Sequence, residues 1–124
     1  MYFAWTALLT AVLWLPYIVN RSMVLGLKDA MGYPNDPKPM APWAERAKKA
    51  HYNAVENLVV FGALVLTAAA TNKFGNATAA SAMVYFWARV VHYLVYAAGI
   101  PYLRTLSFTV GWLACICIFW QIVS

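Results

Sequence analysis

The stretch ERAKKAHYNAVENLVVFGALVL, residues 45–66, begins with the composition of a charged surface helix and ends with that of a membrane span. Nothing in it separates the two halves, so the sequence predicts one continuous helix that carries polar side chains toward the hydrocarbon. An ionised side chain at the centre of a bilayer costs about 2.5–3.5 kcal/mol on insertion scales. Glu56 therefore needs a structural or functional reason to be there.

The composition indicates a membrane protein of one domain, residues 1–124. Hydrophobic residues make up 64% of the chain and charged residues 10%, against about 45–50% and 25% in soluble domains. Four apolar segments are each about long enough to cross ~30 Å of hydrocarbon as a helix. They are Tyr2–Val19, Ala54–Ala70 with its helix extended back to about residue 42, Ala77–Ala98 and Leu106–Val123.

The connections predict how these spans are arranged. Residues 20–42 hold four of the six prolines and are expected to form an irregular loop. The short connections 71–76 and 99–102 make adjacent spans antiparallel, so the predicted fold is an all-α, up-down four-helix bundle. A cleaved signal peptide is the alternative for the first segment, but Met1 is followed by Tyr-Phe-Ala-Trp with no basic region. A retained first span is therefore expected.

The nine basic residues predict the orientation in the membrane. Most of them fall beside the first and third predicted loops, whereas Lys73 alone lies on the other side. By the positive-inside rule the basic side is cytoplasmic and both termini are outside, which in a bacterial inner membrane means the periplasm. Topology alone explains the net charge of +5, so no nucleic-acid partner is expected. The residues on the basic side are Arg21, Lys28, Lys38, Arg46, Lys48, Lys49 and Arg104.

Cys115 and Cys117 stand two residues apart in the last predicted span. That spacing points them to different sides of a helix and does not suit metal ligands. Core packing is the expected role, since a free cysteine behaves as a small buried hydrophobe. No metal site is predicted.

Polar residues on the second helix share one face. At about 100° per residue, Arg46, Lys49, Asn53 and Glu56 fall within a sector of roughly 80°. With a rise of about 1.5 Å per residue, Glu56 lies ~10 Å deeper than Lys49. This stripe is expected to point inward from the cytoplasmic mouth of the bundle.

The third predicted span repeats the pattern. Arg89, His92 and Tyr96 occupy a sector of roughly 60°, with Tyr96 nearest the cytoplasmic end. Arg104 follows at the cytoplasmic start of the fourth span. Two interpretations stay open: a hydrogen-bonded structural network built on a Glu56–Arg89 ion pair, or a pocket for a small, polar and partly anionic ligand.

Two motifs resemble one known family. The run Arg46-Ala-Lys-Lys-Ala-His-Tyr-Asn-Ala-Val-Glu56 resembles the R-x-x-R-A-x-x-N-x-x-E signature of the MAPEG family, the membrane-associated proteins of eicosanoid and glutathione metabolism. The run Arg89-Val-Val-His-Tyr-Leu-Val-Tyr96 and the Arg104-Thr105 pair look like that family's R-x-x-[HY]-x-x-x-Y and its following Arg-[ST]. Lys49 stands for the usual second arginine, and Tyr52 stands where some members place another.

The resemblance implies a homotrimer that binds glutathione between subunits near the cytosolic face. Asn53 and Glu56 would bind the peptide part of glutathione, with the amino group on Glu56. Arg104 would hold the sulfur as thiolate, beside the hydroxyl of Thr105. The implied catalytic set is Arg104, Thr105 and Tyr96, and the implied glutathione-binding set is Arg21, Arg46, Lys49, Asn53, Glu56, Arg89, His92 and Tyr96.

The chemistry of these residues suits a thiol co-substrate. A free thiol has a pKa of about 8.5, and a fixed guanidinium beside the sulfur lowers that pKa by favouring the charged form. The thiolate would then attack a lipophilic electrophile dissolved among the membrane lipids, or reduce a lipid hydroperoxide. The expected function is a membrane glutathione transferase or peroxidase.

Two other functions stay open at this stage. One is a protein of the same fold that binds a thiol or lipid without significant turnover. The other is a small proton-coupled drug exporter, which would place its carboxylate near the midplane without neighbouring arginines.

Overall fold

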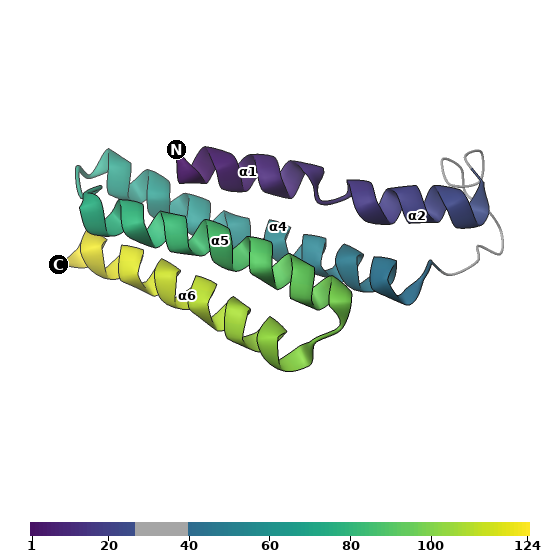
Figure 1. Cartoon of the computed structure of the whole chain (residues 1–124). Helices are drawn as coiled ribbons and strands as arrows, with labels where there is room; N and C mark the ends of the chain where they lie inside the picture. The colour runs from purple at the N-terminus through teal and green to yellow at the C-terminus, as the bar shows by residue number, and fades with distance from the viewer. Residues whose placement is uncertain (27–39) are drawn as a thin grey trace.

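The computed structural model describes residues 1–26 and 40–124. Most of the predicted loop 20–42, with Lys28 and Lys38, lies outside the described residues. The described chain is all helical and folds as an up-down bundle, as predicted (Figure 1). Both termini and the connection 71–75 lie at one end, and the α5–α6 turn lies toward the other (Figure 1).

The first predicted span is a helix broken in two. Helix α1 covers Tyr2–Val12 and α2 covers Leu15–Leu25, with Pro16 in the first turn of α2. Proline lacks an N–H and its ring clashes with the carbonyl four residues back, so the break falls where the sequence places Pro16. Helical structure continues to Leu25 rather than ending near Val19. Together the two pieces form a 24-residue candidate membrane span.

Helix α4 spans Pro42–Ala70 without interruption, which confirms the continuous helix predicted from the opening stretch. Proline suits its first turn because the N–H it lacks would have no partner there. Its 29 residues extend about 43 Å at 1.5 Å per residue, longer than the ~30 Å hydrocarbon layer. The charged first turns can therefore stand in the interface while the apolar remainder crosses the membrane.

Helices α5, Asn76–Ala98, and α6, Pro101–Val123, form an antiparallel pair. Between them, Gly99 takes a left-handed φ of 79°. The N–H of Gly99 bonds the Tyr96 carbonyl and that of Ile100 bonds the Val95 carbonyl, each at 3.0 Å. These two bonds make a Schellman ending, after which Pro101 begins α6. Helix α6 thus starts five residues before the predicted Leu106.

Within residues 1–26 and 40–124, three helical segments are long and apolar enough to cross a membrane: Tyr2–Leu25, which combines α1 and α2, Pro42–Ala70 and Pro101–Val123. Helix α5 is outside this set although it has the same length as α6. Its composition includes Arg89 and His92, which lower its hydropathy. It contacts α1, α4 and α6, so neighbouring helices cover these polar groups.

Small residues on α4 let the helices approach closely. Ala44, Ala47, Ala50 and Ala54 are buried at three- and four-residue spacing and pack in one core cluster with Leu13, Tyr17 and Tyr93. Small side chains at helix interfaces are the usual means of close packing in membranes. The buried face of α4 is therefore this alanine stripe, and the predicted polar stripe lies beside it.

The second core cluster is built around two aromatic rings, on α4 and α5, that pack against α6. The rings of Phe61 and Tyr85 stack with centroids 3.9 Å apart. Phe3 packs edge-on to Phe61 and lies directly against Gly62, where an added Cβ would come within 2.9 Å of its ring. Cys115 is buried in this cluster and Cys117 is exposed.

Tyr93 and Tyr17 brace the break between α1 and α2. The hydroxyl of Tyr93 donates a 3.0 Å hydrogen bond to the carbonyl of Leu13, at the break itself. The hydroxyl of Tyr17 lies 2.8 Å from Nδ1 of His51 on α4. Tyr93 thus holds the break to α5, and Tyr17 holds α2 to α4.

Candidate functional site

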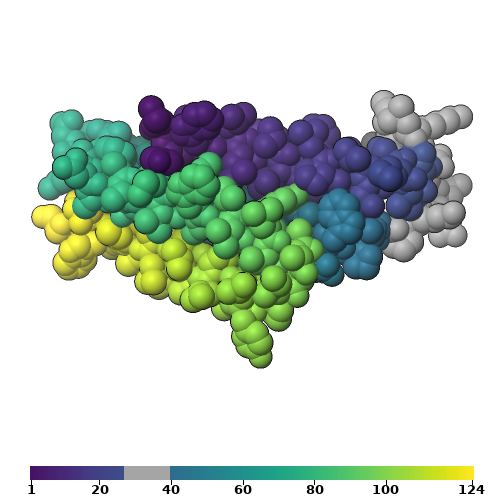
Figure 2. Space-filling model, viewed as in Figure 1, coloured from purple at the N-terminus to yellow at the C-terminus, as the bar shows by residue number. Residues whose placement is uncertain are grey.

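Two arginines converge where α5 ends and α6 begins. Arg46 of α4, Tyr96 and Gly99 at the end of α5, and Pro101 and Arg104 at the start of α6 line a cavity of about 150 Å³, here called the mouth cavity. The guanidinium carbon of Arg104 lies 4.9 Å from the centroid of the Tyr96 ring. The chain around this turn projects from the body of the molecule (Figure 2). A cationic, partly open recess thus stands at the α5–α6 turn, away from the two termini (Figure 1).

Arg89 enters the interior of the bundle from α5 and is only 3% exposed. It donates a 2.6 Å hydrogen bond to Oδ1 of Asn53 on α4. Its Nε has no hydrogen-bond partner among the described residues. The interior therefore holds a cation whose partner is a neutral amide.

A residue that the sequence analysis missed completes this contact. Nδ2 of Asn57 donates to the Asn53 carbonyl at 2.8 Å and lies 3.3 Å from Asn53 Oδ1. Arginine has only donors, so the oxygen of the Asn53 amide must face Arg89. The Asn53 NH₂ group is then directed away from Arg89, where it can donate to an acceptor on a ligand. The four-residue spacing of two asparagines on one helix was the signal available in the sequence.

The Glu56–Arg89 ion pair, on which one of the two open interpretations rests, does not form within the described subunit. Glu56 is exposed on the outer side of α4, while Arg89 bonds Asn53. Lys49 is also exposed, and Arg46 and Asn53 are half-buried. The stripe does not point into the bundle as expected, because the alanine stripe takes the buried face of α4. Glu56 and Lys49 are presented instead on the subunit surface.

His92 is 3% exposed and lies on α5 one turn from Arg89 and one turn from Tyr96. Its ring packs edge-on to Tyr96, with centroids 5.5 Å apart, and lies 6.1 Å from Phe108. The predicted grouping of His92 with Tyr96 is therefore present in the structure. His92 thus packs against the ring on which Arg104 stacks.

Two predicted site residues lie apart from the cavity lining. Thr105 is exposed, and its hydroxyl donates to the Pro101 carbonyl at 3.2 Å. Arg21 is half-buried on α2, the helix that contacts α4, and its Nε has no partner among the described residues. Within residues 1–26 and 40–124, no group of three His, Cys, Asp or Glu side chains is placed to hold a metal ion.

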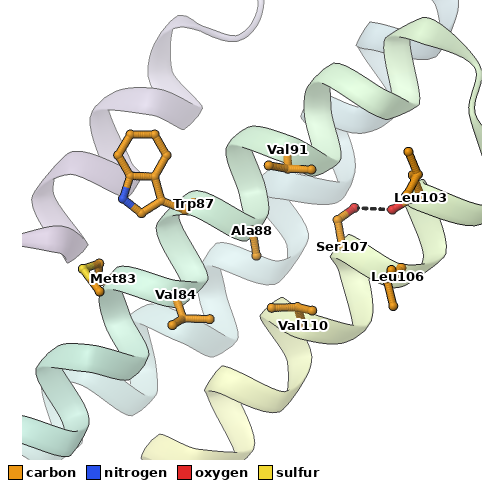
Figure 3. Close-up of a pocket in the computed structure, with 9 residues that line it drawn as sticks. All are labelled: Met83, Val84, Trp87, Ala88, Val91, Leu103, Leu106, Ser107 and Val110. Carbon is orange, nitrogen blue, oxygen red and sulfur yellow. Dashed lines mark hydrogen bonds between the residues drawn. The ribbon is translucent and has the colours of Figure 1, made fainter.

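An apolar groove runs along α5 and α6 from the level of Leu103, the residue before Arg104 (Figure 3). Its volume is about 410 Å³. The hydroxyl of Ser107 donates to the Leu103 carbonyl at 2.8 Å, which leaves the groove with an apolar character. No pattern in the sequence predicted this groove. It is lined by Met83, Val84, Trp87, Ala88, Val91, Leu103, Leu106, Ser107 and Val110.

Comparison with known proteins agrees with the two motifs and the four-helix fold. The MAPEG family model matches residues 2–124. The chain belongs to the MAPEG family, which includes glutathione transferases, and it is an integral membrane protein. Searches of curated proteins and of solved structures found no match.

Proposed function

We propose that this protein is a membrane-bound glutathione transferase or peroxidase, which binds glutathione near the mouth cavity and holds its sulfur as a thiolate. The observation that carries the proposal is the position of Arg104, whose guanidinium is stacked on Tyr96 at the edge of the cavity it shares with Arg46. Arginine keeps its proton at any physiological pH. A guanidinium fixed beside a sulfur therefore favours the thiolate throughout the cycle.

Charge and hydrogen bonding on α4 suit the rest of the tripeptide. The NH₂ group of Asn53 can donate to a carbonyl or carboxylate oxygen, since its own oxygen is occupied by Arg89. Glu56 is exposed on the same helix and can receive the ammonium group of glutathione. These contacts would orient the sulfur toward Arg104, so that catalysis relies on positioning and electrostatics.

The exposure of several of these residues supports a homotrimer. Glu56, Lys49 and Thr105 lie on the outside of one subunit rather than around one enclosed pocket. A neighbouring subunit that packed on this surface would close a site that a single chain leaves open. The number three comes from the resemblance to the family.

The groove between α5 and α6 supports a lipophilic second substrate, because it is apolar and begins at Leu103, the residue before Arg104. In the transferase reaction the thiolate sulfur forms a bond to an electrophilic carbon, and the leaving group departs with the electron pair. In the peroxidase reaction the thiolate cleaves the O–O bond of a hydroperoxide. A second glutathione then yields glutathione disulfide, the alcohol and water.

Calorimetric titration of the protein in nanodiscs with glutathione and with S-methyl glutathione tests the proposal. We expect both to bind, and we expect turnover of an aryl halide with glutathione alone. Binding of glutathione without turnover of either an aryl halide or a fatty acid hydroperoxide would favour a non-catalytic thiol-binding protein. No heat of binding with either ligand would reject the proposal.

A further inference from the structure

Arg46 lies flat against the turn that joins α5 to α6. Its Nε donates a 3.0 Å hydrogen bond to the carbonyl of Ala97, one of the last carbonyls of α5. A Cβ added at Gly99 would lie 3.1 Å from Arg46 Cζ and 3.2 Å from its Nε. The side chain therefore occupies the space that any residue other than glycine would need at position 99.

This contact gives a cationic partner to a carbonyl that the helix itself leaves unpaired. The last four carbonyls of a helix have no partner within it, and the C-terminus carries partial negative charge. A guanidinium that lies across this helix end fits against the turn and donates a hydrogen bond to the Ala97 carbonyl. Glycine is favoured at position 99 for two reasons: its φ is 79°, which other residues rarely adopt, and Arg46 occupies the space of a side chain.

The same turn sets the position of Arg104. The N–H of Ile100 bonds the Val95 carbonyl at 3.0 Å, and the N–H of Arg104 bonds the Ile100 carbonyl at 3.1 Å. The first turn of α6 is thus built directly on the residue that follows Gly99. Tyr96, on which Arg104 stacks, is in the last turn of α5.

We propose that Arg46 is a positioning residue which, through Gly99 and the α5–α6 turn, holds Arg104 over Tyr96. Its role differs from the ligand role that the motif suggested, because its Nε donates to Ala97 and its guanidinium packs against Gly99. The effect on chemistry rests on the proposed function, whereas the effect on the Arg104–Tyr96 geometry does not.

The direct test is NMR of the arginine Nε–H groups in ligand-free protein. The ring current of Tyr96 should displace the Arg104 signal, and Tyr96→Leu identifies that signal. We expect Arg46→Ala, Arg46→Lys and Gly99→Ala each to move the Arg104 signal toward the position of a solvent-exposed arginine. Arg46→Lys retains the charge but loses the planar group that lies on Gly99, and it serves where the alanine variant fails to fold.

Lys48→Ala is the matched control, because it removes one positive charge from the same helix at a side chain that lies 5.7 Å from the Tyr52 ring. It should leave the Arg104 signal in place. An Arg104 signal unchanged in Arg46→Lys and Gly99→Ala would overturn the proposal, as would an equal displacement in Lys48→Ala.

A second measurement follows the thiolate of bound glutathione by its ultraviolet absorbance. If Arg104 is displaced, the pKa of the bound thiol should rise by about one unit, which is a roughly tenfold smaller thiolate fraction below that pKa. Affinity for S-methyl glutathione, which has no thiol, should change less. The Arg104 signal could move in the Arg46 variants while the wild type fails to bind glutathione. That result would support the positioning role of Arg46 and reject only the proposed function.

Discussion

Arg89 on α5 and Asn53 on α4 share a 2.6 Å hydrogen bond that supplies a partner for a guanidinium buried in the bundle. Glu56, one turn further along α4, is exposed and takes no part in it. The stability of the bundle should therefore depend on the amide and not on the carboxylate.

Replacement of Asn53 by leucine should destabilise the subunit, because the buried Arg89 would lose its side-chain partner. The loss of such a partner reduces the free energy of unfolding by about 1–3 kcal/mol, and by more for a charged group. Glu56→Gln should leave the unfolding midpoint of the detergent-solubilised protein unchanged while it weakens glutathione binding. A large fall in the midpoint for Glu56→Gln, with none for Asn53→Leu, would show that the ion pair rather than the amide stabilises Arg89.

The hydroxyl of Tyr93 should stabilise the break between α1 and α2. Tyr93→Phe removes the 3.0 Å bond to the Leu13 carbonyl and should lower the free energy of unfolding by about 0.5–1.5 kcal/mol. Tyr102→Phe is the matched control, since Tyr102 is 88% exposed. Equal unfolding midpoints for the two variants would mean that the hydrogen bond from Tyr93 to Leu13 does not stabilise the subunit.

Two glycines inside helices should respond to alanine with opposite sign. Both substitutions gain helix propensity, about 0.5–1 kcal/mol. At Gly111 the new Cβ meets only ordinary contacts, the nearest at 3.7 Å, whereas at Gly62 it meets the Phe3 ring at 2.9 Å. Thermal unfolding should show Gly111→Ala at or above the wild type and Gly62→Ala below it. The reverse order would contradict the packing of α1 against α4.

The assembly should be a homotrimer. Native mass spectrometry in a mild detergent should give three chains as the main species, because Glu56 and Lys49 lie on the subunit surface and require a neighbour to enclose them. A stable monomer or dimer under conditions that preserve glutathione binding would contradict the interfacial site.

Local signals in the sequence were sufficient for the main elements. Apolar length predicted the bundle. The break before Pro16 was not predicted, although proline geometry explains it, as it explains the helix starts at Pro42 and Pro101. The extension of α6 back to Pro101 was missed, because its first turn is polar and a search for apolar runs begins only at Leu106.

The side-chain partners were harder to predict. Helical periodicity grouped His92 with Tyr96 correctly, since residues four apart on one helix are neighbours. It could not decide which face of α4 is buried, because that depends on how closely α2 and α5 approach the alanine stripe. The partner of Arg89 was therefore assigned to the nearest carboxylate in the pattern, Glu56, instead of Asn53.

The central claim is that Arg104 stabilises the thiolate of bound glutathione. The direct measurement is the ultraviolet thiolate absorbance of bound glutathione against pH, in wild type, Arg104→Ala and the control Lys48→Ala. We predict that wild type and Lys48→Ala titrate well below the free thiol pKa of about 8.5, and that Arg104→Ala titrates near it. The aryl halide turnover of Arg104→Ala should fall on the order of 10²–10³-fold, by analogy with the loss of an oxyanion donor. The same titration curve and the same turnover in wild type and Arg104→Ala would contradict the account.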